Sequence, residues 1–257
     1  MSSSIKPVLG SQLEFGHSLA TGLVGLWLLN EGSGNKVFDL SGNGKDGIFS
    51  GDVSWAAGKF GSSILYGGTA GHINLGSDFL GTTPITIIAW INPATLGDNN
   101  QGRIIDNSQI IFRMFTSSDI IATSNGGGTE LTATGNNIIL NAWQQVAFTR
   151  DSSGASSFLY INGIEEVPGD TGTPASGGTV YTGDRADGLR SFNGMFDHLV
   201  IYNRVLSASE IALLYREPFI MFERDPIELW VGATSVGVPI GNAGIMTTNA
   251  GFWGPTF

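Results

Sequence analysis

The sequence contains no cysteine, and this absence excludes disulfide bonds and thiolate metal sites. Charge is also scarce: charged residues make up 13% of the 257 residues, and only 12 residues are Lys or Arg. Nucleic-acid binding is therefore not expected, because phosphate contacts need clustered Lys and Arg. The formal net charge of −10 instead fits solubility or the binding of a cation.

Long hydrophobic runs and targeting signals are lacking as well. No stretch approaches the roughly 20 apolar residues that a membrane span needs, so we expect no membrane association. The N-terminus does not have the pattern of a signal peptide, because Lys6 is the only Lys or Arg before the first apolar stretch, residues 23–29. The chain contains no Asn-x-Ser/Thr sequon, so N-glycosylation is not expected.

Glycine, by contrast, is abundant, with 38 residues. Short strand-like segments alternate with turn residues over residues 21–216, which is typical of an all-β sandwich or barrel. Residues 85–91 are nearly all apolar and β-branched, which predicts a central strand buried on both faces. Residues 143–149 predict a second central strand, and residues 195–202 predict the last strand of the sandwich.

Local signals place one hairpin turn and one helix within this pattern. Asn162-Gly163 directly follows an apolar strand segment, and this dipeptide is the strongest short hairpin signal. Ser207-x-x-Glu210 is a capping box that predicts the start of a short helix ending near Arg216. Pro218 then prevents its continuation.

The two ends of the chain differ from the middle. We therefore expect an N-terminal arm over residues 1–20, a sandwich over residues 21–216 and a C-terminal arm over residues 217–257. After Glu228 no charged side chain appears, although a free tail in water normally carries charge. The tail should therefore bury its aromatic side chains against the sandwich or another chain. We expect four of them to act in assembly: Trp230, Phe252, Trp253 and Phe257.

Seven blocks, taken in order, resemble laminin-G-like, concanavalin-A-like jelly-roll domains. These blocks are residues 22–34, 37–47, 58–61, 85–93, 143–150, 159–163 and 192–207. The resemblance implies two antiparallel sheets of six or seven strands, a binding role that often involves glycans, and often a structural calcium ion. The family usually has an acidic residue after the Asp of the late block, whereas here His198 follows Asp197.

The segment from residue 214 to residue 230 and onward is similar to the tails of laminin-G-like proteins encoded by bacterial viruses and environmental viral genomes. With the missing signal peptide, sequons and cysteine, it indicates a virion structural protein, either a capsid decoration or a fibre-like component. Such a protein would be made in the host cytoplasm and form a homo-oligomer. It would dock on a capsid or other virion protein through the C-terminal arm. The alternative is a soluble or cell-surface adhesin that binds carbohydrate.

Calcium is the one cofactor that the sequence suggests. A hard cation needs several oxygen ligands from carboxylates and carbonyls. Asp39, Asn43, Asp46 and Asp197 are the candidate ligands, because the resemblance brings the early turn close to the last strand. The alternative interpretation is that Asp39 and Asn43 are ordinary turn residues that bond to their own backbone.

Catalysis is not expected, although one motif suggests glycoside hydrolysis. Glu223, Asp225 and Glu228 have the E-x-D-x-x-E spacing of glycoside hydrolases on this same fold. However, the motif follows the last predicted strand of the sandwich, and Pro226 interrupts it, whereas proline is excluded from central strands. A solvated, charged linker explains these residues better than a catalytic site.

A sugar-binding site needs an exposed aromatic ring that stacks on the sugar and polar groups that bind its hydroxyls. Trp55 and Tyr66 lie near predicted loops and are the candidate platforms. Asn99 and Arg103 belong to a polar loop and are the candidate hydrogen-bonding residues. The other tryptophans in strand patterns are expected in the core.

Overall fold

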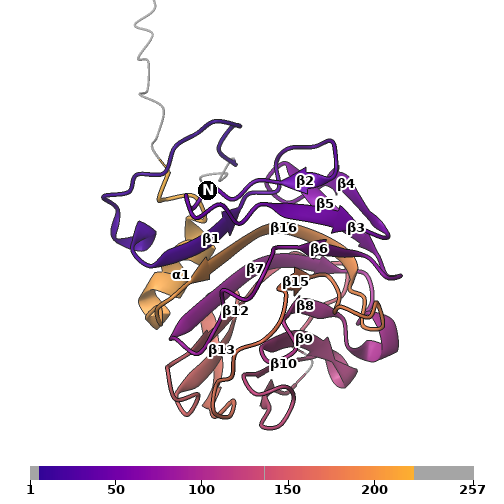
Figure 1. The fold of residues 1–257 in the computed structure, drawn as a ribbon, viewed down its shortest axis with the longest axis vertical. Helices are drawn as coiled ribbons and strands as arrows, with labels where there is room; N and C mark the ends of the chain where they lie inside the picture. The colour runs from indigo at the N-terminus through magenta and orange to yellow at the C-terminus, as the bar shows by residue number, and fades with distance from the viewer. Residues whose placement is uncertain (1–5, 136, 223–257) are drawn as a thin grey trace, which may run out of the picture. The chain divides into compact units, whose positions relative to one another are not determined.

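The computed structural model describes residues 6–135 and 137–222, and these residues form a sandwich of two antiparallel sheets with one short α-helix (Figure 1). This confirms the predicted fold class. Each sheet contains eight strands rather than the six or seven that the resemblance implies. The higher number reflects very short strands, such as β2 (Lys36–Val37) and β15 (Tyr181–Thr182).

The first sheet carries the two predicted central strands. Its strand order is β14-β13-β12-β7-β16-β5-β4, and β1 pairs with β16 outside this path. The bounds are β1 (Leu23–Trp27), β4 (Val53–Ala57), β5 (Ser62–Gly67), β7 (Ile85–Pro93), β12 (Gln144–Arg150), β13 (Ser157–Ile161), β14 (Ile164–Gly169) and β16 (Asn193–Tyr202). Neither β7 nor β12 has an exposed residue, as expected of strands that are covered on both faces.

The second sheet has the order β11-β10-β9-β8-β15-β6-β3-β2. Its remaining strands are β3 (Gly47–Ser50), β6 (His72–Asn74), β8 (Arg103–Asp106), β9 (Ile111–Phe115), β10 (Asp119–Thr123) and β11 (Leu131–Ala133). Three short 3-10 turns lie between strands or before them: η1 (Ser18–Ala20), η2 (Asp98–Asn100) and η3 (Thr116–Ser118). Asn162-Gly163 connects β13 and β14, which confirms the predicted hairpin turn.

The main hydrophobic core lies between the two sheets. Alternate residues of the strands supply it, including Ile87 and Phe148 from the first sheet and Ile73, Ile105 and Phe112 from the second. All five side chains are at most 1% exposed. Burial of this apolar surface is the main force that holds the sheets together, at about 25 cal/mol per Å² removed from water.

A second hydrophobic cluster covers the outer face of the first sheet. Helix α1 (Ala208–Arg216) begins at the predicted capping box, where the Ser207 hydroxyl accepts from the Glu210 amide and the Glu210 carboxylate accepts from the Ser207 amide. The cluster joins α1 to both terminal segments through Leu13, Leu19, Leu206, Ile211, Leu214, Met221 and Phe222. Within the described part of the chain, no helix has the length and apolar character of a membrane span.

The terminal segments thus pack on the sandwich over residues 6–20 and 217–222. Leu13 forms an isolated antiparallel bridge with Phe222, and the Glu14 amide donates to the Met221 carbonyl at 2.9 Å. The predicted assembly residues Trp230, Phe252, Trp253 and Phe257 lie outside the described residues, as do Glu223, Asp225 and Glu228 of the hydrolase-like motif.

A buried ion pair attaches the N-terminal segment to the first sheet. Lys6 Nζ lies 2.7 Å from Asp197 Oδ1, and both side chains are at most 3% exposed. The ammonium also donates to the carbonyls of Ser62 at 2.6 Å, Asp197 at 3.1 Å and Leu29 at 3.4 Å. Burial lowers the pKa of Lys6, and the Asp197 carboxylate opposes this effect. The Lys6 ammonium therefore lies buried among four oxygen atoms of the first sheet and its connections.

Replacement of Lys6 tests the importance of this pair. Lys6→Met leaves the Asp197 carboxylate buried without its cation, so the free energy of unfolding should fall by about 3 to 5 kcal/mol. Lys6→Met/Asp197→Asn should recover much of that loss, because no buried charge then remains. Urea denaturation of the full chain measures both. A loss below about 0.5 kcal/mol for Lys6→Met, within the range of ordinary surface changes, would contradict this account.

His198 follows Asp197 on β16, and its burial predicts that the folded protein loses stability in acid. It is 2% exposed, and burial, together with the nearby Lys6 charge, lowers its pKa to about 3. The unfolded chain binds this proton near pH 6.5 and the folded chain does not. His198 should therefore cost about 1.4 kcal/mol of stability for each pH unit below 6.5, until the folded side chain titrates.

Urea denaturation of the parent and of His198→Gln between pH 7 and pH 4.5 measures this contribution. The parent should lose stability more steeply than the variant as the pH falls, because Gln has no proton to bind. Parallel pH dependences of the two proteins would show that His198 does not contribute.

Candidate functional site

The outward face of the second sheet carries a row of directly paired residues that crosses five strands. Paired residues on neighbouring strands point to the same side of a sheet. The row runs from β3 to β9 through Ile48, Asn74, Tyr181, Asp106 and Ile111. None of the five belongs to the core between the sheets, whereas the intervening residues Ile73, Ile105 and Phe112 do.

Two depressions lie along this row. The first has a volume of about 340 Å³, and its lining includes Arg103, Asp106, Ser108, Ile111, Arg185 and Asp187. The second has a volume of about 450 Å³, and its lining includes Asp46, Ile48, Ser50, His72, Asn74 and Gly76. Tyr181 is paired with a residue of each depression and so lies between them. Its half-buried ring packs edge-on against His72, with ring centroids 4.8 Å apart.

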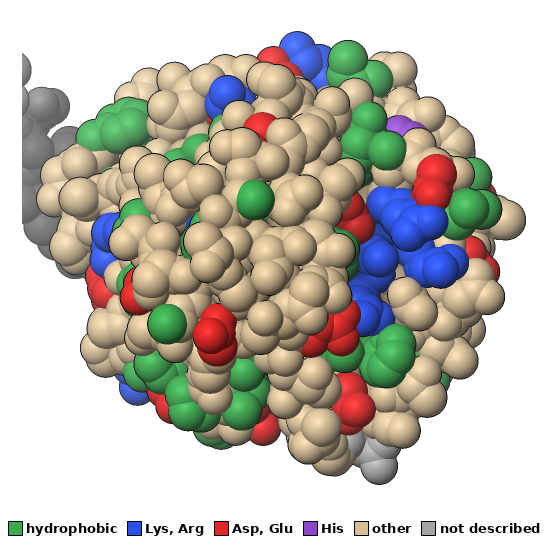
Figure 2. Space-filling view, turned by 60° about the horizontal axis from the view of Figure 1, so that its bottom comes forward, with side chains coloured by type: hydrophobic (Ala, Val, Ile, Leu, Met, Phe, Trp, Pro, Cys, Tyr) green, Lys and Arg blue, Asp and Glu red, His purple; other side chains and the backbone are tan. Residues whose placement is uncertain are grey.

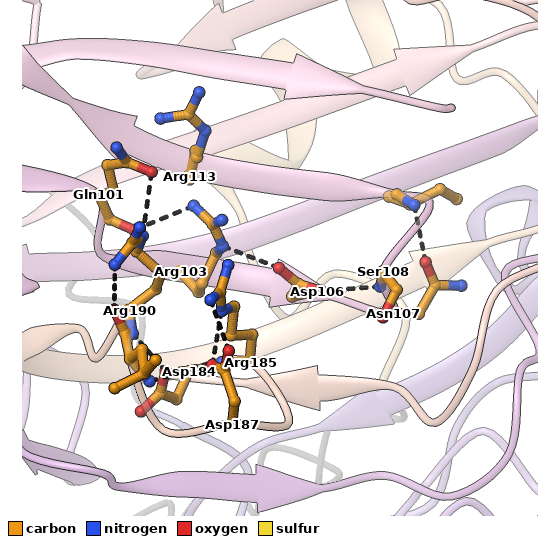
Figure 3. Close-up of polar contacts among 12 residues, drawn as sticks. Gln101, Arg103, Asp106, Asn107, Ser108, Arg113, Asp184, Arg185, Asp187 and Arg190 are labelled. Atoms are coloured by element: carbon orange, nitrogen blue, oxygen red, sulfur yellow. Dashed lines mark hydrogen bonds and ion pairs between the residues drawn. The ribbon is translucent and has the colours of Figure 1, made fainter. Parts of the chain in front are cut away.

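A buried ion pair forms part of the lining of the first depression, which is shown in Figure 3. Arg103 Nε donates to Asp106 Oδ2 at 2.8 Å, and Arg103 Nη1 donates to the Gln101 carbonyl at 3.1 Å. Both members of the pair are at most 4% exposed. Burial is the main influence on each group: it lowers the pKa of Arg103 and raises the pKa of Asp106, while their attraction opposes both shifts. Arg103 and Asp106 are therefore desolvated and held in place by each other, and together they form a polar part of the lining.

The connection from β15 to β16 supplies the opposite wall. The buried Asp184 carboxylate accepts from the amides of Arg185 at 2.7 Å and Arg190 at 2.9 Å, and it also accepts from the Ser191 hydroxyl. These bonds fix the backbone of the connection. Arg185 then bonds to both carboxylate oxygens of Asp187, and the two side chains are 33% and 46% exposed. A rigid backbone therefore presents a solvent-exposed ion pair to the depression.

The structure places the four predicted glycan-binding residues in different environments. Arg103 lines the first depression. Asn99 lies in η2, where its side chain donates to Asp98 Oδ1 at 3.1 Å. Trp55 is half-buried at the edge strand β4, where its indole nitrogen donates to the Gly34 carbonyl at 2.9 Å.

The interpretation of Tyr66 as an exposed sugar platform is wrong. Its ring is fully buried between the sheets, its hydroxyl donates to Thr182 Oγ1 at 3.4 Å, and burial raises its pKa. The alternation of β5 turns this side chain inward. Sequence analysis missed Tyr181, Arg185 and Arg190. The signal that could have found the two arginines is Arg-Ala-Asp-Gly-Leu-Arg at residues 185–190, a charged turn in a chain with little charge.

The predicted calcium ligands all bond to other protein groups. Both Asp39 oxygens accept hydrogen bonds, including those from the Leu26 and Lys45 amides at 3.0 and 2.9 Å. Asp46 accepts from the Asp39 amide and forms an ion pair with Lys36 at 2.7 Å. Asn43 donates to the Leu23 carbonyl, and Asp197 pairs with Lys6.

These bonds favour the interpretation of Asp39 and Asn43 as turn residues. Within residues 6–135 and 137–222, no three His, Cys, Asp or Glu side chains are grouped so that they could hold a metal ion. The four predicted ligands, as they lie in this structure, do not fit a calcium ion. The calcium site stays a prediction.

Comparison with known proteins identifies the fold family of this arrangement. Residues 67–212, more than half of the chain, match the family model Laminin_G_3, described as the concanavalin A-like lectin/glucanases superfamily. No curated protein matches the chain in sequence.

Solved structures share the fold at low sequence identity. Domain 4 of AbnA, an extracellular GH43 arabinanase from Geobacillus stearothermophilus, in complex with arabinotriose, is 18% identical with a TM-score of 0.58, and the match covers 75% of this chain and 98% of that domain. The binding domain of Paraclostridial Mosquitocidal Protein 1 is 19% identical with a TM-score of 0.61, over 79% of this chain and 54% of that one. A mutant Trypanosoma rangeli sialidase is 15% identical with a TM-score of 0.63, over 84% of this chain and 37% of the sialidase. This chain therefore corresponds to only part of the last two proteins, and these likenesses show the fold alone.

Proposed function

This chain belongs to the concanavalin A-like lectin/glucanases superfamily, and we propose that it binds a carbohydrate chain across the outward face of the second sheet. The observation that carries the proposal is the position of Tyr181 between two depressions, each lined in part by polar side chains, in one row of paired residues. An aromatic ring stacks on the apolar face of a sugar, and the surrounding polar side chains bind its hydroxyls. The arabinanase domain with arabinotriose supports the proposal by similarity of fold.

The size of the row favours an oligosaccharide over a single sugar. The row crosses four strand intervals from β3 to β9, which corresponds to about 19 Å at the usual strand spacing. This distance exceeds the width of one sugar ring. Polar side chains are available on both sides of Tyr181: Asn74 and His72 on one side, Arg103 and Asp106 on the other.

Binding is favoured over hydrolysis by the state of the carboxylates. Glycoside hydrolysis needs two carboxyl groups that act as acid and as nucleophile or base. In the first depression Asp106 is bonded to Arg103 and Asp187 is bonded to Arg185. Hydrolysis stays the third candidate function, after the virion protein and the adhesin, and its Glu223 motif lies outside the described residues.

We further propose that the protein is a virion component of a bacterial virus, a capsid decoration or a fibre-like protein, with the carbohydrate-binding face displayed outward. The proposal depends on the similarity of the tail to viral laminin-G-like proteins and on its uncharged, aromatic sequence. In this view the segment after Glu223 docks on a capsid or other virion protein. A soluble or cell-surface adhesin is the second candidate.

The carbohydrate proposal predicts a specific loss on Tyr181→Ala. A glycan array probed with the full chain identifies a bound glycan, and calorimetry then compares the variants. Tyr181→Ala should weaken binding about tenfold, because loss of an aromatic contact costs on the order of 1.4 kcal/mol. Phe15→Ala is the matched control, since Phe15 is an exposed aromatic of the N-terminal segment. The proposal fails if the array shows no glycan bound, or if Tyr181→Ala binds as tightly as the parent.

Deletion of residues 224–257 tests the virion proposal. The deletion keeps every residue of both hydrophobic clusters that the structure describes, so we expect the remaining protein to fold and to unfold cooperatively on heating. It should no longer sediment with particles of the virus, because the docking segment is gone. Truncation after Arg216 is less suitable, since it also removes Met221 and Phe222 from the second cluster. Undiminished sedimentation of the truncated protein would contradict docking through this segment, and a full-length protein that does not sediment with particles would favour the adhesin.

A further inference from the structure

We propose that the carbohydrate is acidic and that its carboxylate binds Arg185 and Arg103 in the first depression, an inference that rests on the proposed function. The chain has 12 Lys and Arg residues against 22 Asp and Glu, yet four arginines belong to this one region. They come from β8, β9 and the connection from β15 to β16: Arg103, Arg113, Arg185 and Arg190 (Figure 3). Figure 2 shows basic side chains gathered in one patch with acidic side chains at its border.

Asp187 occupies the position that a ligand carboxylate would take. Arg185 binds it through Nε and Nη2, the two-bond geometry with which guanidinium recognises carboxylates. Exposed ion pairs contribute little to stability, because water competes for both partners. A carboxylate on a sugar can therefore displace Asp187 from Arg185 at little cost to the fold. Asp184 holds the backbone of the connection independently, and Asp187 Oδ1 can keep its bond from the Leu189 amide at 3.1 Å.

Two further arginines lie close together beside this exposed pair. Arg103 on β8 is directly paired with Arg113 on β9, so the two side chains lie on the same side of the sheet, and Arg113 forms its own ion pair with Glu130 at 2.7 Å. Burial is the main cause of the lowered pKa of Arg103, and the charges of Arg113 and Arg185 lower it further. An additional anion in the depression would relieve this repulsion.

The local carboxylates differ in whether they can be displaced. Asp184 is fully buried and bonded to the backbone, and Asp106 is 3% exposed and paired with Arg103. Asp187 lines the depression and is 46% exposed. It is therefore the internal competitor of an acidic ligand, and its removal should strengthen binding whereas removal of Arg185 should weaken it.

Substitutions of Arg185 and of Asp187 should therefore have opposite effects on the affinity for an acidic carbohydrate. Binding of the full chain is measured by calorimetry at low salt with three carboxylated probes, polygalacturonate, alginate and sialyllactose, and with the neutral methyl ester of each. The parent should bind at least one acid at least tenfold more tightly than its ester. Arg185→Gln should remove most of this preference, and Asp187→Asn should increase affinity for the acid about three- to tenfold. Arg216→Gln, an exposed arginine of α1, should leave binding unchanged.

Three results overturn the inference. One is a change in affinity for the acidic probe that has the same direction in Arg185→Gln and in Asp187→Asn, as expected if the ion pair only stabilises the connection from β15 to β16. Another is equal binding of acid and ester, or binding of neutral glycans alone on the array. Either of these last two results leaves the proposed function intact, because carbohydrate would still bind and binding would still depend on Tyr181. If no glycan of either kind binds, the proposed function fails together with this inference.

Discussion

Burial of both faces of the central strands of the first sheet is the constraint on which the rest of the structure depends. β7 and β12 have no exposed residue, so each needs apolar partners on two sides. The second sheet covers one side, and α1 with the segments at residues 6–20 and 217–222 covers the other. Lys6 and Asp197 add a polar connection within that cover. Because the centre of the first sheet is covered on both sides, we propose that ligand recognition takes place on the outward face of the second sheet, whose strands alternate core and outward-facing residues.

Electrostatics distinguishes this face from the rest of an acidic protein. The carboxylates around its arginines differ in burial: the fully buried Asp184 accepts from the backbone amides of Arg185 and Arg190, whereas the exposed Asp187 binds the Arg185 side chain. The buried groups fix the geometry of the depression, since leaving a buried polar group unsatisfied is costly. The exposed pair can exchange its partner at little cost. A rigid framework with one exchangeable ion pair is an arrangement suited to binding a ligand without rearranging the fold.

Features with strong local patterns could be predicted from the sequence. The apolar run at residues 85–91, the Asn162-Gly163 turn and the Ser207 capping box each specify their element by short-range physics, and the structure contains all three. Other features depend on contacts between residues far apart in the chain. Lys6 lies in a segment that looks like an arm, yet it pairs with Asp197, 191 positions away. The two-residue strand β15 is too short to show alternation, so Tyr181 gave no signal, and Tyr66 was misplaced because its burial depends on the facing sheet.

We propose that this outward face of the second sheet, and no edge of the sandwich, binds carbohydrate. A crystal structure of the full chain with a bound oligosaccharide tests it most directly. The account predicts a sugar ring on Tyr181, with the chain continuing into the depression lined by Arg103 and Arg185. A sugar bound at the strand edges or on α1, with the row from Ile48 to Ile111 free of ligand, would contradict it.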